Sequence, residues 1–239
     1  MAAENPVHPV EARGFSRVAS GAKALVDVTF DVPAGSIAAV VGPSGSGKSL
    51  LLRAVGGRLG CDSGSIRVLG LDPLRDVRAL ATRVGYAPQY AAFPPRTTVG
   101  EVGRLCRRLA GDGDAHWFTR VCQELELLLG ERADRLSEAR GRHLSLALAL
   151  QRSPELVIAD EPDAFALAIL EEIDATVFFA TDRLDVAASH ADQVLLLRCG
   201  HIVDRFVTAG FDLPRRTTAL EEVPAALPMP AERRVPVEL

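Results

Sequence analysis

The distribution of apolar residues along the chain predicts short buried strands that alternate with helices. Ile37 to Val41 is an uninterrupted apolar run, and "ELVIADEP", from Glu155 to Pro162, contains a second one. The stretch "TVFFAT", which ends at Thr181, has the same character. Apolar residues at helical spacing follow the first run, at Leu50, Leu51, Leu52 and Val55. Short apolar runs with helical periodicity between them are typical of an α/β fold.

The loop after the first run carries the strongest candidate chemistry. It fits the spacing G-x-x-x-x-G-K-[ST] with Gly42, Pro43, Ser44, Gly45, Ser46, Gly47, Lys48 and Ser49. Glycines let backbone N–H groups converge on a phosphate, and the helix that follows adds the positive end of its dipole. In this arrangement Lys48 reaches the β- and γ-phosphates, and the Ser49 hydroxyl ligates Mg²⁺. The order of strand, loop, Lys-Ser and helix favours a phosphate-binding loop over a plain glycine-rich turn.

Two carboxylates at the end of the second run supply the complementary chemistry. Asp160 is placed to hold Mg²⁺ through water, and Glu161 is placed to polarise an attacking water as a general base. Open α/β sheets bind ligands at the carboxyl ends of their strands, which favours this interpretation over an exposed turn. The sequence therefore predicts a site for ATP and Mg²⁺.

The order of the remaining segments resembles that of the ATP-binding cassette (ABC) ATPases. "CDSGSIRVLGLDPL" resembles their strand after the phosphate-loop helix, and "RVGYAPQY" resembles the segment with their Q-loop glutamine, here Gln89. "TTVGEVGRLCRRLAG" resembles the first helix of their helical subdomain. "DRLSEARGRHLSLALAL", from Asp134 to Leu150, takes the place of their signature motif, and "ADQVLLLRCGHIVDRF" resembles the closing strand pair. The resemblance runs from about Val10 to Phe206.

This resemblance implies an α/β fold: a P-loop NTPase core of mixed sheet flanked by helices, with an antiparallel β subdomain and an inserted α-helical subdomain. We expect an ATPase domain over 1–213, with the helical subdomain at about 90–153. The Pro-rich segment 214–239 is predicted to be a disordered tail.

The resemblance also implies roles and partners. Glu161, Gln89 and Lys48 are the expected catalytic residues. The expected assembly is a head-to-tail dimer with a second ABC ATPase subunit, identical or different, in which each ATP lies between one subunit's phosphate loop and the other's signature motif. Gln89 would couple the site to a membrane subunit, which would dock on the helical arm between Gln89 and Ser137.

The signature motif departs from the family pattern. Leu136 and Ser137 match, but Glu138 and Ala139 stand where the family has two glycines. A carboxylate about 5 Å from a phosphate charge costs roughly 3 kcal/mol at an effective dielectric constant of about 20, if Glu138 faces the nucleotide. Equally, Glu138 and Arg140 form a solvated helix start, where an acidic residue suits the dipole. The sequence leaves both interpretations open.

Three further positions depart from the family. Asp182 stands where the family usually has a histidine, and a carboxylate there would repel the γ-phosphate; we do not expect the nearby His190 to substitute. The family's D-loop aspartate aligns with Leu167, and Asp163 is not at that spacing.

The last departure concerns the adenine base. No aromatic residue stands at Ala19, where the family's stacking ring falls, and Phe15 is the nearest candidate. Loss of such a stack costs roughly 1–3 kcal/mol per base, so we expect weak ATP binding by the isolated chain.

Composition limits the classes of partner. The net charge of −4 gives no basic bias toward nucleic acid, and the four cysteines form no C-x-x-C pair, which indicates reduced thiols. No signal peptide and no run of about 18 apolar residues are found, so a membrane role must come through other chains. We therefore expect a cytoplasmic protein, peripheral on the inner face of the membrane.

The expected function is an ATP-binding and ATP-hydrolysing subunit that powers an ABC transporter through separate membrane subunits, as the degenerate half of an asymmetric pair. "LGLDPLRDVRALATRVGYAPQ" favours export, whereas "FPPRTTV" also resembles metal-importer ATPases; the balance leans to export. An ATP-binding regulatory subunit with little hydrolysis and a soluble non-transport ABC ATPase are the alternatives. Copurification with an integral membrane protein separates the last of these from the others.

Overall fold

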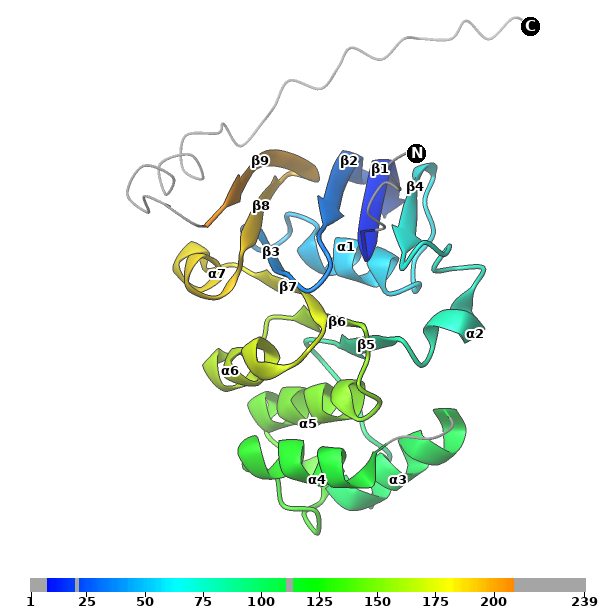
Figure 1. Cartoon of the computed structure of the whole chain (residues 1–239), viewed down its shortest axis with the longest axis vertical. Helices are drawn as coiled ribbons and strands as arrows, with labels where there is room; N and C mark the ends of the chain where they lie inside the picture. Colours follow the sequence, from blue (N-terminus) through cyan, green and yellow to red (C-terminus); the bar gives the residue numbers. More distant parts are fainter. Residues whose placement is uncertain (1–7, 20–21, 111–113, 209–239) are drawn as a thin grey trace, which may run out of the picture.

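Two β-sheets form the centre of the molecule. The computed structural model describes residues 8–19, 22–110 and 114–208. A three-stranded antiparallel sheet has the order β2-β1-β4, with β1 (Val10–Ala19), β2 (Ala22–Val32) and β4 (Ser63–Val68). A six-stranded sheet has the order β5-β6-β7-β3-β8-β9 (Figure 1). Its strands are β3 (Ile37–Val41), β5 (Val84–Ala87), β6 (Leu156–Asp160), β7 (Thr176–Thr181), β8 (Gln193–Arg198) and β9 (His201–Val207).

The strands of the larger sheet are parallel except β9, which is antiparallel to β8. The expected mixed sheet and the antiparallel sheet are thus confirmed. The apolar runs at 37–41 and within 155–162 form β3 and β6, and β3 lies between β7 and β8.

The larger sheet is buried on both faces, which explains why its strands are continuous apolar runs. Ala38 and Val40 pack toward the smaller sheet, whereas Ala39 and Val41 pack toward the helices on the other face. Phe178 stacks on Phe30 of the smaller sheet with ring centroids 5.4 Å apart. Strands covered on both faces lose the alternation of apolar and polar residues that a half-exposed strand shows.

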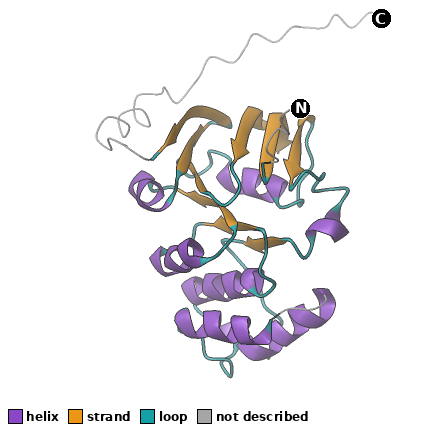
Figure 2. Cartoon of the chain, viewed as in Figure 1, coloured by secondary structure: helices purple, strands orange, loops and turns teal. Residues whose placement is uncertain are grey.

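Helices cover the two faces and one end of the larger sheet. α1 (Lys48–Val55) packs between the two sheets, while α6 (Ala164–Glu172) and α7 (Leu184–His190) lie on the opposite face (Figures 1 and 2). The short α2 (Val77–Leu80) precedes β5. α3 (Val99–Ala110), α4 (Ala115–Glu124), the 3₁₀ turn η1 (Ala133–Arg135) and α5 (Glu138–Leu150) gather at one end and are called the helical arm here.

The predicted limits of the domain and of the helical subdomain stay predictions, and the predicted tail at 214–239 lies outside the described residues. Within the described ranges, no helix combines the length and apolar character that a bilayer crossing demands.

Candidate nucleotide-binding site

Two glycines in the loop between β3 and α1 stand where only a hydrogen atom fits. A Cβ atom on Gly42 would lie 2.0 Å from the carbonyl oxygen of Leu197. Gly47, the N-cap of α1, has φ +108°, and a Cβ there would lie 2.9 Å from the carbonyl oxygen of Ala24. The first backbone N–H groups of α1 have no partners within the helix. They are therefore available to an anion that lies in this loop. This cradle fits a phosphate.

Lys48 lies at the first turn of α1 with its ammonium group held by oxygen atoms. Nζ donates to the carbonyl oxygens of Gly42 at 2.8 Å and Pro43 at 3.3 Å, and it lies 3.6 Å from Glu161 Oε1. The Lys48 side chain is 7% exposed, so this charge depends on its partners. Phosphate oxygens in the cradle would therefore compete with Glu161 for the ammonium group.

Ser49 and Asp160 form a pair of oxygen ligands suited to Mg²⁺. Ser49 Oγ donates to Asp160 Oδ1 at 3.2 Å, and Asp160 is the last residue of β6. Burial raises the pKa of the Asp160 carboxyl, which a bound cation would counter. Mg²⁺ is commonly held by one or two such side chains together with substrate phosphates. Among the described residues, no cluster of three or more His, Cys, Asp or Glu side chains could hold a metal ion.

Glu161 follows β6 in a left-handed backbone conformation, with φ +54°, which is uncommon for a residue with a side chain. Its N–H donates to the carbonyl oxygen of Ala180 at 3.0 Å, which holds this turn against β7. Burial raises the pKa of the Glu161 carboxyl; Asp182 and Asp160 add to this effect and Lys48 opposes it. A carboxylate with a raised pKa is a stronger base toward water.

These groups surround one cavity of about 530 Å³. The described residues that line it are Ser44, Gly45, Gly47, Lys48, Ser49, Leu50, Gln89, Arg142, Glu161, Pro162, Asp163, Ala164, Thr181, Asp182, Arg183, Val186 and His190. The structure thus brings Gln89, which follows β5, to the same cavity as Lys48 and Glu161. Asp160 lines a small adjoining cavity that shares Glu161. The combination of cradle, ammonium group, Ser-Asp pair and basic carboxylate can bind a nucleoside triphosphate with Mg²⁺.

Comparison with known proteins agrees with this geometry. The family model described as ABC transporter matches residues 25–164, more than half of the chain. This chain belongs to the ABC transporter family. The match covers the phosphate loop, Gln89, the signature segment and the Asp160-Glu161 pair.

This ABC protein covers only part of the length of two curated relatives. It is 32% identical to the phosphonates import ATP-binding protein PhnC of Anaeromyxobacter dehalogenans, over 88% of this chain and 46% of the relative. It is 35% identical to the Fe(3+) ions import ATP-binding protein FbpC 1 of Rhodococcus jostii, over 82% of this chain and 61% of the relative. The chain therefore spans about half to three fifths of the length of these relatives. The fold matches the solved ATP-binding subunit of an ABC transporter with a TM-score of 0.75, at 23% identity, over 90% of this chain and 95% of that one.

The ABC signature segment adopts the solvated arrangement in this structure. Ser137 is the N-cap of α5, and its hydroxyl accepts from the N–H of Arg140 at 3.4 Å. The Glu138 side chain is 60% exposed and pairs with Arg142 at 3.3 Å. Arg140 pairs with Glu131, and its Nη2 donates to the carbonyl oxygen of Glu126 at 2.6 Å. The sequence left two interpretations of Glu138 open, and these contacts favour the helix start.

Asp163 has a structural role that its spacing does not reveal. Its Oδ1 accepts from the N–H of Ala166 at 3.0 Å, which caps α6, and its Oδ2 lies 2.6 Å from Nε2 of His143 on α5. Leu167, which aligns with the D-loop aspartate of ABC proteins, is 1% exposed and belongs to the core. His190 lines the nucleotide cavity at the end of α7, but its Nδ1 lies 2.5 Å from Glu171.

One candidate from the sequence is wrong. Phe15 is 1% exposed and packs in the core between the two sheets, so its ring is not available to stack on adenine. A register shift in β1 between Ala12 and Phe15 turns the Phe15 side chain to the buried face that Val10 and Ala12 also occupy.

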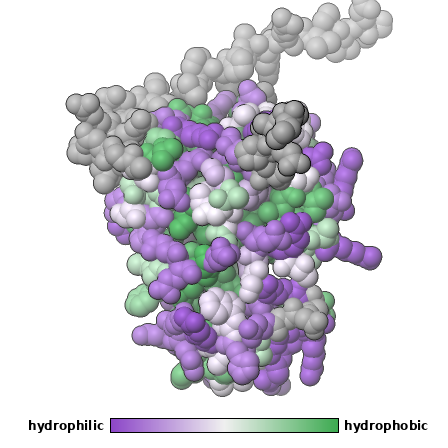
Figure 3. Space-filling model, viewed as in Figure 1, coloured by the Kyte–Doolittle hydropathy of each residue, from purple (hydrophilic) through white to green (hydrophobic). Residues whose placement is uncertain are grey.

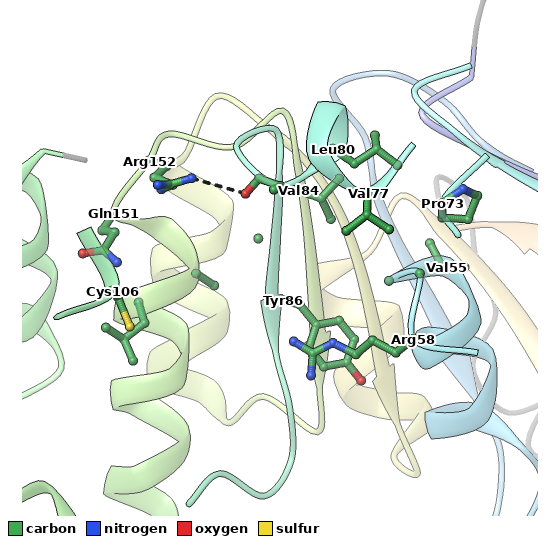
Figure 4. Close-up of a pocket in the computed structure, with 16 residues that line it drawn as sticks. Val55, Arg58, Pro73, Val77, Leu80, Val84, Tyr86, Cys106, Gln151 and Arg152 are labelled. Atoms are coloured by element: carbon green, nitrogen blue, oxygen red, sulfur yellow. Dashed lines mark hydrogen bonds between the residues drawn. The ribbon is translucent and has the colours of Figure 1, made fainter. Parts of the chain in front are cut away.

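A second cavity, of about 330 Å³, lies between the helical arm and the core, beside the edge strand β5 (Figure 4). Arg58, in the bend that follows α1, lies over the ring of Tyr86 at 4.1 Å from its centroid. Cys106 of α3 lies across the cavity, and Arg152 donates to the carbonyl oxygen of Ala81 at 3.4 Å. Nearby Val77 is 52% exposed, and hydrophobic residues gather near α2 on the face shown in Figure 3.

Proposed function

We propose that this chain binds and hydrolyses Mg-ATP as the motor subunit of an ABC transporter whose membrane domains lie on separate chains. The observation that carries the proposal is the convergence of Lys48, Ser49, Gln89 and Glu161 on one cavity next to Asp160. Lys48 and the glycine cradle would hold the phosphates, and Ser49 with Asp160 would hold Mg²⁺. Bound Mg²⁺ would supply charge neutralisation at the phosphates.

The catalytic part of the proposal concerns Glu161 and Gln89. Glu161, with its raised pKa, would accept a proton from the attacking water. Its present contact with Lys48, at 3.6 Å, would be exchanged for water when phosphate oxygens take over the ammonium group. Gln89 lies between the nucleotide cavity and the helical arm, so it would report the state of the cavity to that arm.

A specific observation favours a second candidate, an ATP-binding regulatory subunit with little hydrolysis. Asp182 lines the same cavity as Glu161 and adds negative charge where the γ-phosphate would lie. A carboxylate there opposes the build-up of charge in the transition state. In that case the chain would bind ATP and pair with a second, more active ABC subunit.

The cavity beside β5 supports docking of a membrane subunit on the helical arm. It contains an aromatic residue, an arginine and apolar side chains next to the exposed Leu74 and Val77, and α3 contributes Cys106. Such a mixed groove suits a short segment from another protein. The chain would then be peripheral on the cytoplasmic face of the membrane.

For the direction of transport, we propose import. The sequence motifs lean to export, but the phosphonate and ferric-ion relatives are both named as import proteins. The substrate would be selected by other chains.

The proposal is tested by Lys48→Ala. We expect at least about tenfold weaker binding of a labelled, non-hydrolysable ATP analogue, because a charge-assisted hydrogen bond is worth about 1.5–3 kcal/mol. Arg53→Ala, an exposed α1 residue that does not line the cavity, is the control and should bind as the unmodified chain does. Undiminished binding by Lys48→Ala in equilibrium titration would refute the assignment.

A further inference from the structure

Arg142 is a positive charge that the helical arm brings to the nucleotide cavity. It lies one turn into α5, and among the described residues of that helix it is the one that lines the cavity shared by Lys48, Gln89 and Asp182. It also lines the small cavity next to Asp160 and Glu161. The site residues predicted from the sequence do not include it.

The guanidinium group of Arg142 is loosely held. Nη1 donates to Glu138 Oε1 at 3.3 Å, a pair on the outer surface of α5 whose carboxylate is 60% exposed. Exposed pairs of this kind contribute little because solvent screens them. The Nε atom is buried, and no acceptor lies against it among the described residues. A buried N–H without an acceptor is unfavourable, so this group gains when an oxyanion comes within reach.

The other arginine and the lysine that line the cavity each have more than one hydrogen-bond contact. Arg183 forms two contacts with Asp185, at 2.6 and 3.3 Å. Lys48 is held by two carbonyl oxygens and Glu161. Asp163 has His143 as its partner, whereas Asp182 and Glu161 add negative charge to the wall. Among the described residues that line the cavity, Arg142 is thus the cation that combines one long ion-pair contact with a buried N–H that has no acceptor.

We propose that Arg142 recognises the terminal phosphate of the nucleotide bound by its own subunit. This inference rests on the proposed function of the cavity. A triphosphate places its γ-phosphate among Glu161, Gln89 and Asp182, where the carboxylates oppose it. The planar guanidinium group matches two phosphate oxygens at once, so Arg142 leaves Glu138 and offsets Asp182. A diphosphate has no group at this position and leaves the Glu138 pair intact.

The test compares two nucleotides on the full chain. Dissociation constants are measured by titration calorimetry for ADP and for a non-hydrolysable ATP analogue, both with Mg²⁺. Arg142→Gln should weaken binding of the analogue about tenfold and leave ADP binding within about twofold. Arg142→Lys should weaken binding of the analogue less than Arg142→Gln does. Lysine keeps the positive charge but lacks the planar group that can donate to two phosphate oxygens. Glu138→Gln should strengthen binding of the analogue by about two- to threefold, because Arg142 is released.

Arg120→Gln is the matched control. Arg120 pairs with Glu124 at 2.8 Å with the same i,i+4 spacing, on α4 and outside the cavity. It should bind both nucleotides as the unmodified chain does. Unchanged analogue binding by Arg142→Gln, or an equal loss for ADP and analogue, overturns this inference alone. An unmodified chain that binds neither nucleotide overturns the proposed function, and this inference with it.

Discussion

At the residue scale, the buried carboxyl of Asp160 costs stability while the cavity holds no cation. Its pKa is raised by burial, so the folded chain binds the proton of Asp160 more tightly than the unfolded chain does. The contribution to stability is therefore most favourable below the unfolded pKa and is lost as pH rises through the folded pKa. At neutral pH the charged Asp160 carboxylate therefore lowers the free energy of unfolding. Its proposed role in holding Mg²⁺ explains why a carboxylate stands at this buried position.

Asp160→Asn should consequently stabilise the nucleotide-free chain at neutral pH. Ser49 can still donate to the amide oxygen, and the buried charge is gone. Thermal unfolding should show a higher melting temperature, each kcal/mol corresponding to about 2–4 °C in a domain of this size. The difference should shrink as pH falls, because the native Asp160 becomes protonated. Mg-dependent nucleotide binding should weaken in the same variant. A lower melting temperature at neutral pH would contradict this account.

At the scale of elements, one side chain joins α5 to α6. Asp163 caps α6 through the N–H of Ala166 and accepts a hydrogen bond from Nε2 of His143 on α5. The edge of the Phe165 ring also faces His143, with centroids 6.5 Å apart. The turn after Glu161 is thereby fixed to the helix that begins with the signature segment. Stability of the turn and position of the arm depend on the same carboxylate.

Asp163→Ala should lower the free energy of unfolding by about 1–2 kcal/mol, since it removes a cap and the partner of His143. Asp163→Asn keeps an oxygen that can accept the N-cap hydrogen bond. It should therefore lower the free energy of unfolding by less than about half as much as Asp163→Ala does. Urea denaturation of the two variants measures the difference. Equal losses would mean that the negative charge matters and the cap does not.

Particular residues show why some of this was predictable from the sequence. β3 and β6 could be predicted because burial on both faces leaves an unmistakable apolar run, and the glycine spacing of 42–47 follows from close backbone approach. The place of Arg142 at the nucleotide cavity could not be predicted, because it depends on which face α5 turns toward the core. Phe15 was only the nearest aromatic residue in the sequence, and the register shift in β1 that turns it into the core could not be foreseen from residue spacing. The roles of Lys48, Gln89 and Glu161 remain predictions.

At the scale of the whole molecule, a head-to-tail dimer of the kind that the ABC resemblance implies would place two carboxylates near each γ-phosphate. Asp182 lines the nucleotide cavity of its own subunit, and Glu138, at the start of α5, would be contributed by the opposite subunit. In the single chain Glu138 is paired with Arg142, so any transfer of Arg142 to phosphate leaves that carboxylate without its partner. Charge repulsion would therefore oppose closure of such a homodimer, and a partner with an intact signature motif would relieve only the Glu138 part.

Steady-state ATP hydrolysis by the purified chain alone should accordingly be slow. Asp182→His together with Glu138→Gly should raise turnover, by about tenfold for each 1.4 kcal/mol of relieved repulsion. Glu161→Gln should remove what activity remains. Phosphate release at saturating Mg-ATP gives the comparison. Fast hydrolysis by the unmodified chain would show that Asp182 and Glu138 do not slow the reaction.

The place of β3 in the sheet has a consequence for synthesis on the ribosome. β3 leads directly into the glycine loop, yet both of its neighbours, β7 and β8, come from the last third of the chain. Until they have left the exit tunnel, β3, which leads into Gly42, has no hydrogen-bonding neighbours, and Leu197 is not yet there to close the loop. Pairings between distant segments form late because the intervening chain must first be ordered. A nascent chain halted before β7 would therefore present the phosphate-loop sequence without its cradle, and nucleotide could not rescue it from degradation.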